Sequence, residues 1–277
     1  MQKDDKTIRG QAGSNDYPTA SELAFFGFYH GSLDLPGAGL HNIPMERLID
    51  GLAWYLAFVL SVTCHEAAHA WVALKMGDST AYHGGQVTLD PVPHIRREPF
   101  GMVVVPILSF VLGGWMMGWG SAPYDPHWAL DHPKRSSWMA LAGPAANLAL
   151  VVLAGIVIRI GLLAGFFAAP DAISMNRAVE PAGLAALSGA AGFISILFSL
   201  NLILFFFNLL PLPPLDGGAL PLLFLTRNQA RTYLETLWNP SYSFIGLIIA
   251  WNLFDHIFGP IHLAGINLLY LGVASYG

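Results

Sequence analysis

The chain has 277 residues, of which 54% are hydrophobic and only 11% are charged, and its formal net charge at pH 7 is −5. Soluble domains carry nearer ~25% charged residues, so this composition excludes an ordinary soluble enzyme, and the negative charge excludes a nucleic-acid binder. A single cysteine, Cys64, excludes a disulfide framework and a cluster of thiolate ligands. The class that remains is an integral protein of a lipid bilayer, and we expect an all-α polytopic membrane protein.

The chain begins with a polar segment and continues in apolar stretches. We expect residues 1–44 to form a loosely ordered tail, with an interfacial helix as the alternative for the aromatic patch from Phe25 to Tyr29. A membrane-spanning helix needs roughly 17–25 residues, so six stretches are weighed as spans, and the last two are marginal. The stretches are 51–74, 100–118, 137–167, 184–210, 242–258 and 261–276. We divide the chain into the tail (1–44), a core (45–220) and C-terminal membrane helices (221–277).

The segment between the first two stretches is predicted to form a short β-hairpin region at the membrane. Gly84 and Gly85 offer a turn, and residues 86–89 alternate between polar and apolar side chains, as a strand does. Pro91 and Pro93 then restrict such a strand to the edge of a sheet. Because unpaired backbone groups need water or protein partners in a bilayer, we expect this edge to line a cavity.

The strongest chemical signal is the pentapeptide from His65 to His69, His-Glu-Ala-Ala-His, inside the first apolar stretch. In a helix, residues four apart share one face, so both imidazoles can bind one metal ion. Glu66 lies beside the first histidine, where it can act as a general base. The alternative is a pair of helix histidines bonded to other groups. Ionisable residues inside an apolar span are costly, however, and this favours the metal site.

A catalytic zinc site usually has three protein ligands, so a third must come from elsewhere in the chain. The candidate is Asp216, which follows the fourth apolar stretch and a proline-rich break and precedes Gly217 and Gly218. These prolines and glycines unwind the backbone at an acidic residue, which a bilayer tolerates only around a cavity or inside protein. On this motif alone, a solvated aspartate in an interfacial turn fits equally well.

Three motifs in order resemble the site-2 protease family of intramembrane zinc metalloproteases, in its short bacterial and archaeal form. They are His65-Glu-Ala-Ala-His69, Ala142-Gly-Pro-Ala-Ala-Asn147, and Asn208-Leu-Leu-Pro-Leu-Pro-Pro-Leu-Asp216 followed by Gly. The resemblance implies one Zn²⁺ per chain bound by His65, His69 and Asp216, with Glu66 as the catalytic base. It also implies a substrate cleft bordered by Asn147 and Asn208, and a substrate that is a transmembrane segment of a partner protein.

A shared metal ion constrains the topology. His65 and His69 lie towards the C-terminal end of the first stretch, and Asp216 lies past the C-terminal end of the fourth. Both ends share one side of the membrane only if the second or third stretch does not cross fully. We expect residues 100–118 to re-enter, because four glycines and Pro106 weaken that helix.

Charge placement then predicts the orientation in the cell membrane. The basic residues on the metal side are Lys75, Arg96, Arg97, Lys134, Arg135, Arg227 and Arg231. Near the membrane, the opposite side carries Arg47 and Arg177; Arg159 and the three basic residues of the tail count against this asymmetry, but the tail is far from the first span. The positive-inside rule therefore predicts an active site nearer the cytoplasmic side.

The predicted activity is metal-assisted hydrolysis of peptide bonds within or near transmembrane segments, with Glu66 transferring the proton. Three alternatives stay open. A metal transporter would leave Glu66 unexplained, and a di-iron oxidase would need more clustered histidines. A catalytically silent protein that holds membrane helices would bind its partners without metal and without cleavage.

Overall fold

The computed structural model describes residues 45–277, so the tail and its alternative interfacial helix lie outside the described residues. Within them, three helical segments are long and apolar enough to cross a membrane: α1 (Met45–Met76), α6 (Pro133–Leu163), and Ala185–Asn208, which joins η3 (Ala185–Leu187) to α7 (Ser188–Asn208). The last long helix, α9 (Pro240–Leu269), is bent by 52° and makes a fourth crossing if its halves form one span. The predicted all-α membrane fold is confirmed.

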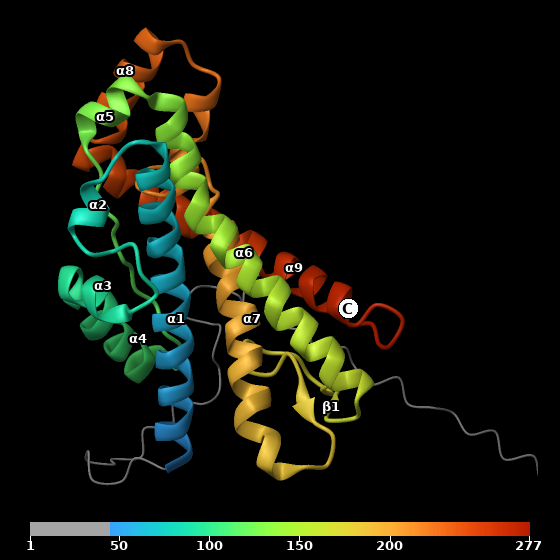
Figure 1. The fold of residues 1–277 in the computed structure, drawn as a ribbon. Helices are drawn as coiled ribbons and strands as arrows, with labels where there is room; N and C mark the ends of the chain where they lie inside the picture. Colours follow the sequence, from blue (N-terminus) through green and yellow to red (C-terminus); the bar gives the residue numbers. More distant parts are fainter. Residues whose placement is uncertain (1–44) are drawn as a thin grey trace, which may run out of the picture.

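The long helices pack side by side around an apolar core. Helix α6 lies against both α1 and α7, and α1 and α6 run in opposite directions (Figure 1). The core between these helices includes Trp54, Phe58, Ile158 and Ile196, all almost fully buried. Large apolar side chains also cover the outer faces, as a surface in contact with lipid tails requires.

The strand predicted for residues 86–89 is wrong. These residues form bends and no ladder, and the small sheet lies elsewhere, where β1 (Phe167–Ala168) pairs antiparallel with β2 (Glu180–Pro181). Asp90 instead caps α3 (Pro91–Arg97) by accepting a hydrogen bond from the backbone N–H of Val92, and Pro91 occupies the first turn. An aspartate followed by proline is a helix start, and this local signal outweighs a four-residue alternation.

The second apolar stretch contains only a short helix. It forms the π-helix η2 (Phe100–Val104) and then α4 (Val105–Gly113), after which Gly114 adopts the left-handed conformation with φ of 75°. These two pieces of 5 and 9 residues rise roughly 21 Å in total, less than the ~30 Å of a bilayer core. Residues 114–125 then continue without helix or strand towards α5 (Pro126–Asp131). The helical part of this stretch is thus shorter than a full crossing, and its re-entrant course stays a prediction.

The C-terminal region differs from the two separate stretches that were weighed. Residues 242–258 and 261–276 mostly belong to the single bent helix α9, which continues through Pro260. Before it, the 3₁₀ segment η4 (Asp216–Leu223) leads into the amphipathic helix α8 (Arg227–Leu237). A capping box between Thr226 and Gln229 begins α8, which packs against α5 on the same side as α2 (Thr80–His83) (Figure 1).

Candidate metal centre

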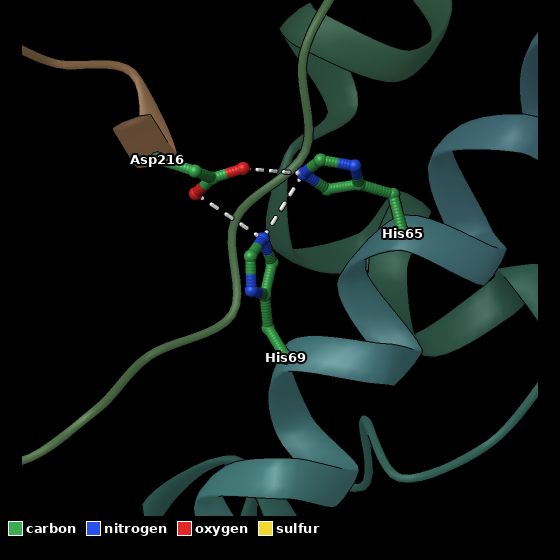
Figure 2. Close-up of side chains that lie close together, drawn as sticks. All are labelled: His65, His69 and Asp216. Carbon is green, nitrogen blue, oxygen red and sulfur yellow. Dashed lines mark hydrogen bonds and ion pairs between the residues drawn. The ribbon is translucent and has the colours of Figure 1, made fainter. Parts of the chain in front are cut away.

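Three side chains from two distant parts of the chain converge beside the N-terminal half of α6. His65 and His69 project from one face of α1, and their Nε2 atoms lie 3.0 Å apart (Figure 2). Asp216 approaches from η4, with Oδ2 3.0 Å from His65 Nε2 and Oδ1 3.3 Å from His69 Nε2. One ligand atom from each residue fits within a 4.8 Å cluster. This arrangement was predicted from the motifs, and it resolves the choice between a solvated turn and a converging loop.

Residues of helix α6 contact the Nδ1 atom of each imidazole, whereas the Nε2 atoms face Asp216. His65 Nδ1 lies 2.5 Å from Asn147 Oδ1, and His69 Nδ1 lies 2.8 Å from the carbonyl oxygen of Met139. Both partners are oxygen acceptors, so each Nδ1 donates a hydrogen and each neutral ring leaves Nε2 with a bare lone pair. The two lone pairs face each other and face a carboxylate.

Such a concentration of lone pairs is stable only around a positive charge, a proton or a metal ion. Asp216 Oδ2 is buried and accepts no hydrogen bond of good geometry, although His65 Nε2 is close, as expected when neither atom carries a hydrogen. Two imidazole nitrogens and a carboxylate are a donor set typical of catalytic zinc. The residues present therefore fit the ion that the resemblance implies.

Gly143 leaves the room that an ion would need. A Cβ atom at this position would overlap the Nε2 atoms of both histidines. Met139, Gly143 and Asn147 follow one another in steps of four residues, so one face of α6 supplies a carbonyl, an open space and an amide in succession. The glycine and the asparagine of the Ala-Gly-Pro-Ala-Ala-Asn motif thus serve the same face.

The loop that carries Asp216 is fixed by close backbone packing and by α8. A Cβ at Gly217 would overlap the backbone of Leu209 at the end of α7, so only glycine permits this approach. The hydroxyl of Tyr233 on α8 donates a hydrogen bond of 2.7 Å to the carbonyl of Gly218. Burial raises the pKa of the Tyr233 phenol above its ordinary value, which keeps this donor protonated.

Glu66 lies beside the cluster and its carboxylate is uncommitted. Glu66 is only 6% exposed, and among residues 45–277 its carboxylate accepts no hydrogen bond and forms no salt bridge, although its charge acts on the neighbouring His69. Gly120, in the irregular segment 114–125, passes so close that a Cβ there would lie 2.9 Å from Glu66 Oε1. A buried carboxylate without a partner is costly, which is typical of a group kept free for chemistry.

The two asparagines predicted to bind substrate occupy different surroundings. Asn147 is fully buried, and its amide is already bonded to His65 and Asn201, so binding substrate would require one of these bonds to open. Asn208 is the last residue of α7 and half-buried, and its amide donates to the carbonyl of Leu204. Among the described residues, Asn208 has no hydrogen bond to the cluster. The substrate-binding role of both stays a prediction.

Several residues of the site were not predicted. Met139 contributes only its backbone, which no sequence motif reveals. Gly120 acts through close packing against Glu66, and Tyr233 through a hydrogen bond to the Gly218 carbonyl, and both contacts join distant segments. Asn201 did leave a signal, because it is a polar residue inside the apolar stretch 184–210, where such residues are costly and often functional.

A family model matches the region that forms this site, and relatives match more than half of the chain. Residues 53–251 match the family model described as peptidase family M50. The chain is 37% identical over 163 residues to a Bacillus subtilis protein named "Putative zinc metalloprotease YwhC", covering 58% of this chain and 64% of that protein. It is 35% identical over 164 residues to the Mycolicibacterium smegmatis "Putative zinc metalloprotease Rip2", covering 59% of this chain and 54% of that protein. The matched region thus spans less than two thirds of either relative, and no solved structure is a significant match.

Proposed function

This chain belongs to peptidase family M50, the site-2 protease family, and we propose that it is a zinc metalloprotease that cleaves transmembrane segments of other membrane proteins. The observation that carries the proposal is the convergence of His65, His69 and Asp216, with the unpartnered carboxylate of Glu66 alongside. A binding protein without chemistry would have no use for a buried, uncommitted carboxylate next to a metal site.

The proposed chemistry divides into binding and proton transfer. His65, His69 and Asp216 would hold one Zn²⁺ per chain, and bound zinc would polarise a carbonyl and lower the pKa of water towards ~7. Glu66 accepts the proton of the attacking water and then delivers it to the amine that leaves the broken peptide bond. The helices around the site limit the entry of bulk water, which strengthens these electrostatic interactions.

The side chains around the site support a position inside the bilayer, close to one surface. Trp71 on α1 and Trp138 on α6 are both exposed, as expected for tryptophans at a membrane interface. Trp71 follows His69 by two residues, and Trp138 directly precedes Met139, whose carbonyl contacts His69. Lys75 and Lys134 lie just beyond them. This order of apolar, aromatic and basic residues supports a site within the membrane and nearer the cytoplasm.

The test compares purified wild-type protein with Glu66→Gln in vesicles that contain a reporter with one transmembrane helix. Wild type should cleave the reporter, lose activity on chelation and regain it with zinc. Glu66→Gln should retain one zinc per chain by elemental analysis and cleave at least ~100-fold more slowly. Glu235→Gln is the matched control, because Glu235 is an exposed residue of α8, and it should behave as wild type.

Other outcomes would contradict the proposal. Cleavage by Glu66→Gln at the wild-type rate would remove Glu66 from the mechanism. Reporter binding without cleavage by either protein would favour the silent binder, and zinc uptake into the vesicles would favour a transporter. A di-iron oxidase is disfavoured because residues 45–277 contain one candidate metal cluster, with two histidines and one aspartate.

A further inference from the structure

Three polar side chains lie behind His65, at the meeting point of α1, α6 and α7. They are Ser61, Asn147 and Asn201, and each is 0% exposed. We call them the buried polar network. Polar groups are costly in the middle of apolar helices, and these three come from three different helices. Apolar packing alone therefore does not explain why these three polar side chains are buried together.

The bonds of the network have a defined direction. Ser61 Oγ donates to the carbonyl of Ala57 at 2.6 Å, so its oxygen accepts from Asn201 Nδ2 at 2.8 Å. Asn201 Nδ2 uses its other hydrogen on the carbonyl of Leu197 at 2.8 Å. The amide oxygen of Asn201 must then face Asn147, and it accepts from Asn147 Nδ2 at 2.8 Å.

The last bond of the buried polar network joins Asn147 to His65 and so reaches the metal centre. Asn147 Nδ2 donates to Asn201 Oδ1 at 2.8 Å and makes a longer bond of 3.5 Å to the backbone carbonyl of Ser61, so Asn147 Oδ1 faces His65 Nδ1 and accepts its hydrogen. A flipped Asn147 would present its NH₂ group instead, and His65 would need its hydrogen on Nε2, the atom that faces Asp216. In that tautomer His65 cannot bind a metal through Nε2.

We propose that Asn201, supported by Ser61, is a positioning residue for the metal centre, because it fixes the amide of Asn147 and thereby the tautomer and ring orientation of His65. The inference rests on the metal site of the proposed function and adds residues that do not touch the ion. Partners of metal-bound histidines typically change metal affinity by about 10- to 100-fold when they are removed.

The test is zinc affinity, measured by competition with a chromogenic chelator on the full chain in detergent. Asn201→Leu has a similar volume and no hydrogen-bonding group, and it should weaken zinc binding by about 10- to 100-fold. Asn201→Asp, in its neutral form, keeps an acceptor for Asn147 and a donor for Ser61 or Leu197, so it should lose less affinity than Asn201→Leu. Ser61→Ala should lose less again, because Asn201 keeps its bond to Leu197.

A matched control separates positioning from stability. Ser195 lies on the same helix, is equally buried, and bonds to Ala191 and Val179 away from the metal centre. Ser195→Ala should lower the thermal unfolding midpoint without changing zinc affinity. The visible absorption of bound Co²⁺ is the second measurement: it should change in Asn201→Leu and match wild type in Ser195→Ala.

The outcomes distinguish this inference from the proposed function. Zinc affinity and Co²⁺ absorption in Asn201→Leu equal to those of wild type would overturn the positioning role alone. A wild-type protein that binds no more zinc than a His65→Ala variant would overturn both proposals. If Asn201→Leu does not fold, Ser61→Ala decides, because affinity equal to that of Ser195→Ala would overturn the inference.

Discussion

The metal centre is built from two halves of different character. The helical half consists of α1 and α6, which present their residues in regular steps of four along facing surfaces. The irregular half consists of residues 114–125 and 209–223, which bring Gly120 against Glu66 and Asp216 against the histidines. The helical half holds the two imidazoles, whereas the irregular half brings the Asp216 carboxylate to them and borders Glu66, the proposed base.

The largest effect is expected in the helical half, at Gly143. Gly143→Ala places a methyl group against both Nε2 atoms, so the two imidazoles must move away from their positions beside Asp216, and stoichiometric zinc binding should be lost and cleavage with it. Elemental analysis of the purified protein measures this. Gly155→Ala, on the same helix with its nearest side-chain atom at 3.6 Å, is the control and should keep its zinc. Full zinc occupancy in Gly143→Ala would show that this helix does not border the ion.

An intermediate effect is expected in the irregular half, at Gly120. Gly120→Ala brings a Cβ to 2.6 Å from Glu66 Cγ, so the carboxylate must move while the histidines stay in place. Zinc content should remain at the wild-type level and reporter cleavage should fall at least ~10-fold, as displaced catalytic groups commonly cause. Gly84→Ala, with only ordinary contacts at 3.4 Å or more, is the control. Loss of zinc in Gly120→Ala would contradict the division between the two halves.

The smallest effect is expected at Tyr233, which braces the Asp216 loop from α8. Tyr233→Phe removes one hydrogen bond to the Gly218 carbonyl, a loss of about 0.5–1.5 kcal/mol, so zinc affinity should fall by at most ~10-fold. Chelator competition measures the change. Tyr242→Phe, at a half-exposed tyrosine of α9, should leave the affinity unchanged. Equal affinities for both variants would show that the loop holds Asp216 without help from α8.

The sequence predicted the helical half better than the irregular half. The spacing from His65 to His69 fixes a shared helix face by geometry alone, and the motif around Gly143 and Asn147 marks the opposing helix. The strand at residues 86–89 was wrong because Asp90 and Pro91 start a helix there, a local signal that period-two alternation concealed. The final helix was weighed as two spans divided at Gly259 and Pro260, whereas α9 continues through Pro260 and bends between Phe254 and His256.

The sequence by itself determined the class of protein and placed His65 and His69 on one helix face, because composition and helical periodicity are local properties, whereas Asp216 was favoured as a ligand only through the family resemblance. Only the tertiary structure decided which groups hold the imidazoles, since the Met139 carbonyl and the amide of Asn201 reach the site through contacts between distant helices. It also decided the close passage of Gly120 beside Glu66. Such contacts depend on the packing of whole helices, and no short stretch of sequence encodes that packing.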